Sequence, residues 1–131
     1  DHWCPLSRQS IKILKEIRRL TGKGDNIFPG KTDPSKFISE TTLNGCIWAL
    51  GYKTRHTTHG ARAVFSTICN DSGKWNRDAV ERQLAHVQSN KIRSAYNRAE
   101  YIEERRRILQ WYADRLDHLR EPKVIPLRRS A

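Results

Sequence analysis

The stretch that decides the fold is residues 92–119, IRSAYNRAEYIEERRRILQWYADRLDHL. It contains neither Gly nor Pro, and its E-E-R-R-R block places opposite charges three and four residues apart, a spacing that stabilises a helix. On a helix that turns about 100° per residue, most of its apolar residues fall on one side. They are Ala99, Ile102, Leu109, Tyr112, Ala113 and Leu116. The pattern predicts one long amphipathic helix and a mainly α protein.

Shorter helices are expected between the N-terminus and this long one. The expected spans are residues 7–20, 35–50, 58–70 and 76–87, with Ser7, Ser35, Thr58 and Asn76 as their first, capping residues. Gly51 follows the second span and should end it. The Gly and Pro of residues 21–34 exclude regular structure there, apart from a few extended residues at Ile27 and Phe28. We therefore expect about five helices and at most a short strand near residues 27–28.

The length of 131 residues fits a single domain with one core. We place this domain at residues 1–121, because Pro122 and Pro126 end the long helix. Residues 122–131 form a basic tail that we expect to be flexible. The chain starts with Asp1 and contains no Met, which indicates a piece of a longer protein.

The net charge of +11 indicates a polyanionic partner, and nucleic acid is the leading class, with an anionic membrane surface as the alternative. No apolar run approaches the ~18 residues of a membrane-spanning helix, and the chain does not begin with a signal-peptide pattern. The cysteines, Cys4, Cys46 and Cys69, show no C-x-x-C spacing, so neither a disulfide framework nor a zinc site is expected. These features predict a cytoplasmic protein without a zinc site.

A first constellation of polar residues lies in TTHGARAVFST, residues 57–67. On a helix, His59, Arg62 and Ser66 share one side, which we expect to face solvent, at a helix start whose backbone N–H groups attract anions. The opposite, core-facing stripe would consist of Ala61, Val64, Phe65 and Ile68. An arginine fork can hold two phosphate oxygens, and an imidazole beside it can transfer a proton. The pair is therefore either a phosphodiester clamp or, in so basic a chain, a coincidence on the surface.

A second constellation consists of His86, at the end of one expected helix, and Tyr96, near the start of the long one. Tyr96 falls off the apolar side of the long helix and can present its hydroxyl to a ligand, whereas Tyr101 lies at the edge of that side and should pack. His86 could instead be a histidine favoured by the helix dipole, and Tyr96 a half-buried aromatic residue.

Several basic residues near these constellations are candidates for DNA contacts. We assign this role to Arg55, His56, Lys91 and Arg93. A further alternative treats residues 77–101 as a helix-turn-helix, whose second helix would read a DNA groove. The side chains that contact the groove would be those of Lys91, Arg93 and Arg98.

THGARAVFST and ERQLAHVQSNKIRSAYNRAEYIEERRRILQWYADRLD together resemble the C-terminal part of tyrosine recombinases, specifically the integrases of bacteriophages and genomic islands. The signature of that family is H-x-x-R, then a second His or Trp, then a nucleophilic Tyr, and all three occur here in order. Near the N-terminus, H-W-x-P-L-S-R-Q and I-F-P extend the resemblance to nearly the whole chain.

The resemblance implies a role for each residue of the two constellations. Arg62 would bind the scissile phosphate, His59 would assist proton transfer, His86 would donate to a nonbridging oxygen, and Tyr96 would attack the phosphorus. Such enzymes cut double-stranded DNA at attachment sites through a 3′-phosphotyrosyl link, as homotetramers, with neither metal nor nucleotide. Attack by a phenol of pKa ~10 needs charge neutralisation at the phosphate and help in removing the proton, which Arg and His supply.

The chain also departs from the family pattern. The family uses another arginine and a lysine that precede the stretch resembled by DHWCPLSRQ, and neither can be located here. Lys12 and Arg18 are tempting substitutes, but both look like the solvated face of an amphipathic helix. We therefore expect the C-terminal half of a catalytic domain, unable to recombine DNA alone, whose basic tail could dock on a neighbouring subunit. The alternative is a non-catalytic basic helical module that binds DNA or RNA.

Overall fold

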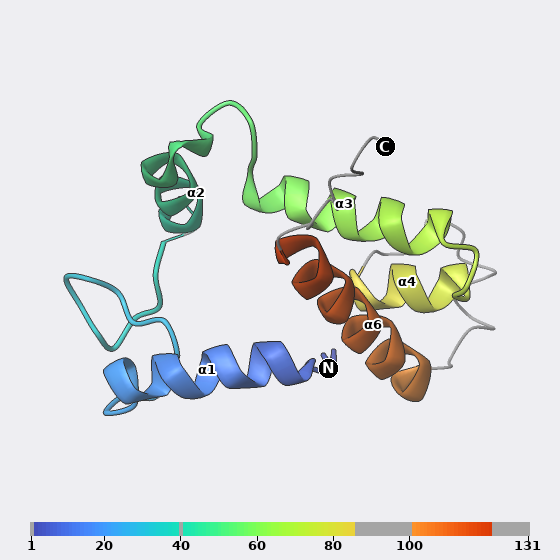
Figure 1. Cartoon of the computed structure of the whole chain (residues 1–131). Coiled ribbons are helices and arrows are strands. Elements are labelled where there is room, and N and C mark those ends of the chain that lie inside the picture. Colours follow the sequence, from blue (N-terminus) through green and yellow to red (C-terminus); the bar gives the residue numbers. More distant parts are fainter. Residues whose placement is uncertain (1, 40, 86–100, 122–131) are drawn as a thin grey trace, which may run out of the picture.

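A computed structural model describes residues 2–39, 41–85 and 101–121 (Figure 1). Its elements are α1 (Arg8–Thr21), α2 (Thr42–Ile47), the π-helical turn η1 (Trp48–Tyr52), α3 (Thr58–Asp71), α4 (Arg77–Gln83) and α6 (Ile102–Arg120). Within these ranges the protein is mainly α and has no strand, only one antiparallel bridge between Pro29 and Phe37. The expected architecture of about five helices is confirmed for this part of the chain.

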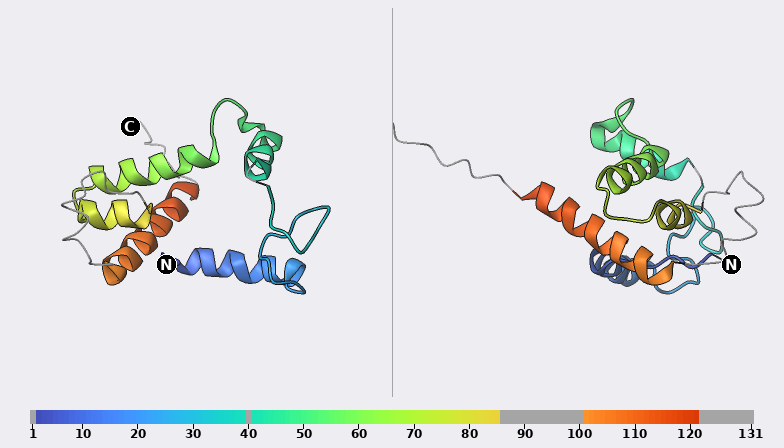
Figure 2. Two further views of the ribbon diagram at one scale, coloured as in Figure 1. Left: turned by 180° about the vertical axis from the view of Figure 1, so that it is seen from behind. Right: turned by 90° about the vertical axis from the view of Figure 1, so that its right-hand side faces the viewer.

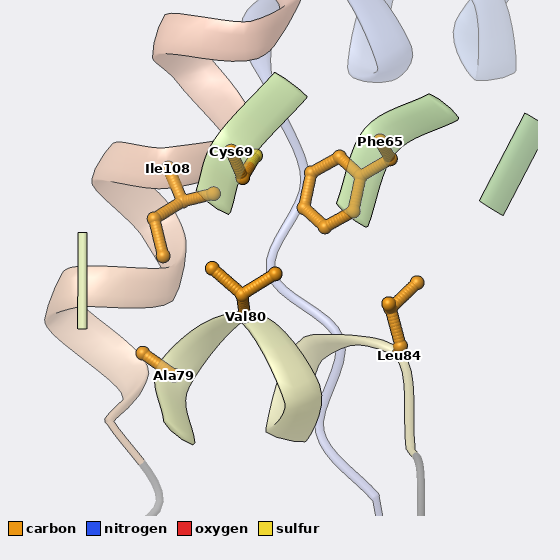
Figure 3. Packing of buried hydrophobic residues seen from close by; sticks show 6 residues of the cluster. All are labelled: Phe65, Cys69, Ala79, Val80, Leu84 and Ile108. Carbon is orange, nitrogen blue, oxygen red and sulfur yellow. The ribbon is translucent and has the colours of Figure 1, made fainter. Parts of the chain in front are cut away.

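The core lies where α3, α4 and α6 meet, and it is small. Among the described residues, the buried apolar side chains are Phe65, Cys69, Ala79, Val80, Leu84 and Ile108. Figure 3 shows Val80 pointing from α4 toward α3, where Phe65 and Cys69 lie. Tyr112 of α6 meets the Phe65 ring edge-on, with 5.0 Å between the ring centroids. These contacts join α3, α4 and α6 into one packed unit.

Helix α1 begins as predicted but contributes no buried residue. The Ser7 side chain accepts a hydrogen bond from the Ser10 amide at 3.2 Å, so the predicted cap is confirmed. The helix is attached to α6 by polar side chains: Gln9 Nε2 donates to the carboxylates of Asp114 and Asp117, each at 2.8 Å. Seen from front and back (Figures 1 and 2), α1 runs along one side of the three-helix unit, and α2 lies near the start of α3. The apolar side of α1 therefore lies outside the core.

The prediction of a helix over residues 35–50 is wrong at its start, because α2 begins at Thr42. Residues 28–38 fold back on themselves instead, with backbone bonds from Gly30 N to Lys36 O at 2.7 Å and from Ile38 N to Phe28 O at 3.0 Å. The Asp33 carboxylate accepts from both the amide and the hydroxyl of Ser35, which holds this residue in a turn. At the other end, Gly51 has φ +85°, as expected of a residue that breaks a helix.

Three other helix boundaries also differ from the predictions. The cap of α3 is Thr57 rather than Thr58. Asn76 caps α4 as expected, but α4 ends at Gln83 rather than near residue 87. The long helix cannot run unbroken through residues 92–119, because Tyr101 has φ +48° and α6 starts directly after it. The part of that prediction before residue 101 and the tail at residues 122–131 lie outside the described residues.

Candidate active site

His59 and Arg62 line the same hollow on the outer face of α3. Its volume is about 250 Å³, and its remaining lining residues are Ala63, Ser66 and Thr67. The side chains of His59 and Arg62 come together because residues three apart are neighbours on a helix. His59, Arg62 and Ser66 were predicted to share one side, and the structure confirms this part of the first constellation.

The start of α3 offers fewer anion-binding donors than the sequence predicts. The Gly60 amide donates to Thr57 Oγ1 at 2.9 Å, and the Thr58 amide donates to Asn44 Oδ1 of α2 at 3.0 Å. The Thr58 hydroxyl lies 3.1 Å from the same Asn44 oxygen. These partners satisfy two of the first N–H groups of the helix within the protein itself. An anion in the hollow would therefore depend mainly on side chains.

The sequence suggested that Arg62 lies on the side of α3 opposite the core, and the structure contradicts this. The predicted core stripe is wrong at Ala61 and Val64, since both are exposed and Val64 is 44% accessible. It is confirmed at Phe65, which is buried together with Cys69, and Ile68 is half-buried. At about 100° per residue, Arg62 borders this buried face. Its guanidinium Nη2 donates to the backbone carbonyl of Leu84 at the end of α4. This contact uses one of the five N–H donors of the guanidinium and fixes its position beside the hollow.

Arg55 and His56, predicted to contact DNA, line a different hollow of about 390 Å³ between η1 and the start of α3. Its other lining residues are Ile47, Leu50 and Tyr52. Arg55 is exposed, but His56 is half-buried. A Cβ placed on Gly60 would lie 3.5 Å from His56 Nδ1, so the imidazole packs closely against the first turn of α3. The structure therefore places these two residues next to the first constellation without adding them to its hollow.

The second constellation is not described by the structure. His86, Tyr96, Lys91 and Arg93 lie outside the described residues, as do Arg98 and most of the second helix of the helix-turn-helix alternative. Ala85, directly before His86, has φ +53°, and Tyr101 has φ +48°. A left-handed backbone costs a non-glycine residue about 1–2 kcal/mol, so the surrounding structure holds both positions. Lys12 and Arg18 are exposed on α1, as expected of a solvated face.

Sequence reasoning missed one residue near this site. Arg105 was taken only as a member of the E-E-R-R-R block, whose charge pairs support the helix, yet it is fully buried, with 0% accessible surface. Its spacing could have revealed it, because it follows Ile102 by three residues and precedes Leu109 by four, which places it on the apolar side of the helix.

The described ranges contain neither a group of potential metal ligands nor a membrane-spanning helix. There, no three His, Cys, Asp or Glu side chains are grouped so that they could hold a metal ion. Within the same ranges, every helix is too short or too polar to cross a bilayer.

The chain is similar to curated proteins that include phage and prophage integrases. It is 44% identical over 128 residues to the protein IntB of Escherichia coli K12, 41% identical over 120 residues to the integrase of Enterobacteria phage P4, and 38% identical over 114 residues to the prophage integrase IntA of E. coli K12. These matches include 95%, 89% and 87% of this chain but only 32%, 27% and 27% of the relatives, so the chain spans about a third of their length or less. No family model matches the chain. No solved structure matches it either.

Proposed function

Since the chain is a homologue of phage and prophage integrases over nearly its whole length, we propose that it carries the strand-transfer site of a site-specific DNA recombinase. One observation supports this most directly: His59 and Arg62 line a single hollow in a chain of net charge +11. The substrate is double-stranded DNA at attachment sites, and the acting form is a homotetramer of the longer protein.

In this proposal Arg62 binds the scissile phosphate. One of its N–H groups is anchored on the Leu84 carbonyl, and others can donate to two nonbridging oxygens. The half-buried Ser66 hydroxyl lines the same hollow and can add a donor. The exposed imidazole of His59 lies one turn away and can serve as a proton donor or acceptor for the reacting groups.

Tyr96 and His86 complete the proposed reaction. The Tyr96 phenolic oxygen attacks the phosphorus and loses its proton with help from His59, while His86 donates to a nonbridging oxygen. The bond from phosphorus to the 5′ oxygen breaks, and that oxygen takes up a proton to leave as a 5′-hydroxyl. The DNA stays attached through a 3′-phosphotyrosyl bond until the 5′-hydroxyl of a partner strand attacks it in the reverse reaction. These cleavage and rejoining steps need neither a metal nor a nucleotide.

The test is formation of a covalent adduct on a suicide attachment-site duplex, detected on denaturing gels. Because the isolated chain is expected to be inactive, it is compared with a chimaera in which it replaces the matched stretch of the phage P4 integrase. The chimaera should form the adduct, Tyr96→Phe should abolish it, and Arg62→Ala should slow it by about 10²–10³. Arg77→Ala, an exposed arginine at the start of α4, is the matched control. An adduct that survives Tyr96→Phe would transfer the nucleophile's role to Tyr101.

The basic composition also supports a second candidate, a non-catalytic module that binds DNA through its charge alone. In that case Arg62→Ala and Arg77→Ala should weaken DNA binding equally, each reducing the salt slope by about one unit. No chimaera would then form an adduct. The strand-transfer proposal instead requires Arg62→Ala to reduce the cleavage rate far more than Arg77→Ala does.

A further inference from the structure

Arg105 is a fully buried charged residue with partners in two distant segments. Its Nε donates to Gln83 Oε1 at 3.0 Å, and its Nη2 donates to the backbone carbonyl of Trp3. The same Nη2 lies 3.4 Å from Nε2 of His2. A buried guanidinium is tolerated only when such groups compensate for its lost hydration. One side chain of α6 therefore holds both the N-terminal segment and the last residue of α4.

The position of Gln83 links Arg105 to the proposed site. Gln83 immediately precedes Leu84, whose backbone carbonyl accepts the hydrogen bond from Arg62 Nη2. A continuous series of contacts thus runs from Arg105 through the end of α4 to Arg62. The backbone amide of Arg105 also donates to the Tyr101 carbonyl at 2.8 Å, which closes the first turn of α6.

In the sequence, Leu84 at the end of α4 and Tyr101 at the start of α6 flank the segment that contains the remaining proposed catalytic residues. His86 follows Leu84 by two residues in the sequence, and Tyr96 precedes Tyr101 by five. We infer that Arg105 is a positioning residue: it fixes the end of α4, so that the Leu84 carbonyl meets Arg62, and it fixes the start of α6 relative to that point. Its effect on strand transfer rests on the proposed function, but its effect on the end of α4 does not.

The structural half of the inference is tested by amide hydrogen exchange on the full chain carrying Arg105→Gln. Exchange at Leu84 and Ala85 should accelerate at least about tenfold more than exchange at Phe65 and Cys69 in α3. The control is Arg106→Gln, because Arg106 is an exposed neighbour that pairs with Glu103 at 2.9 Å. It should leave all four amides unchanged.

An equal acceleration of all four amides would overturn the inference, because Arg105 would then only stabilise the fold as a whole. No change at Leu84 and Ala85 would overturn it as well. If Arg105→Gln does not fold, Gln83→Ala provides the test, since it removes the Nε acceptor and keeps the arginine. It should show the same selective acceleration at Leu84 and Ala85.

The functional half uses the chimaera and separates binding from chemistry. Arg105→Gln should slow adduct formation about tenfold or more while the Kd for the duplex changes less than about twofold, because misplacement of reacting groups impairs the reaction more than the affinity. Arg105→Lys should not restore the rate, since one ammonium cannot reproduce the fork that reaches both Gln83 and Trp3. A rate and an affinity that fall together would contradict a positioning role. If the parent chimaera forms no adduct, the proposed function fails, while the exchange pattern still decides the role of Arg105.

Discussion

Replacing Ile108 by Ala should remove a large part of the stability of this protein. Ile108 belongs to α6, is completely buried, and packs in the cluster to which α3 and α4 contribute Phe65, Cys69 and Val80. Within the described ranges only six apolar side chains are buried, so few others can compensate. A small core of this kind concentrates the burial energy in single residues.

The magnitude follows from the atoms that are lost. Ile108→Ala removes three carbon atoms, and at about 0.8 kcal/mol each this gives a transfer loss of roughly 2.4 kcal/mol. An incompletely relaxed cavity adds further cost, so we expect about 3–4 kcal/mol in total. The control is Leu119→Ala on the same helix, where the side chain is 58% accessible. It should change the free energy of unfolding by no more than about 0.5 kcal/mol.

Urea unfolding followed by circular dichroism measures both variants, and the midpoint and the slope are fitted separately. A fall in midpoint at constant slope would mean that the folded state has lost packing energy. Equal shifts for Ile108→Ala and Leu119→Ala, or a loss below about 1 kcal/mol for Ile108→Ala, would refute the reasoning. The junction of α3, α4 and α6 could then not be what holds the chain folded.

Three further predictions concern single groups. Thr57→Ala should cost about 1 kcal/mol in the same urea assay because α3 loses its cap on the Gly60 amide, whereas Thr57→Ser should cost much less. The hydrogen bond from Gln9 lowers the pKa of the Asp114 carboxyl in the folded protein. Ionised Asp114 therefore stabilises the fold above the ordinary Asp pKa of about 4, and this stabilisation is lost as the pH falls through the lower pKa of the folded state. Gln9→Ala should raise the Asp114 midpoint in an NMR titration, and an unchanged midpoint would contradict that cause. Burial raises the pKa of the Cys69 thiol to about 11, so a thiol reagent at neutral pH should modify exposed Cys4 and reach Cys69 only after unfolding; equal rates would contradict the buried environment.

The local features were predictable because their causes lie within a few residues of sequence. Ser7 and Asn76 cap helices through their own side chains, and Gly51 ends a helix through its own backbone freedom. The neighbouring positions of His59 and Arg62 follow from the spacing of a helix alone. The sequence therefore sufficed for the helical class and for the prediction that His59 and Arg62 are neighbours.

The failures have two kinds of cause, a competing contact close in sequence and a partner far away in sequence. Ser35 resembles a helix cap, but the carboxylate of Asp33 captures both its amide and its hydroxyl in a turn. The spacing of Arg105 places it on the apolar side of its helix, but the spacing does not identify its partner, the Trp3 carbonyl 102 residues away in sequence, which accepts its hydrogen bond. Such a partner becomes visible only once the N-terminal segment is placed against α6.

Arg62 connects the core with the proposed site, and this changes how its variants must be interpreted. The same guanidinium that lines the hollow also donates to the Leu84 carbonyl, while Phe65 and Cys69 occupy the adjoining buried face of α3. Truncating Arg62 therefore leaves a backbone carbonyl without this donor in addition to removing a phosphate ligand. Loss of cleavage in Arg62→Ala measures phosphate binding only if the stability of the variant is measured as well. Arg62→Lys cannot separate the two effects, because one ammonium cannot serve the Leu84 carbonyl and a phosphate with the geometry of the fork. Leu84 offers a complementary test, because an ester in place of the Leu84–Ala85 amide bond weakens the Leu84 carbonyl as an acceptor and leaves the Arg62 side chain intact. The ester also removes the Ala85 N–H, which donates to the Arg82 carbonyl at 3.1 Å.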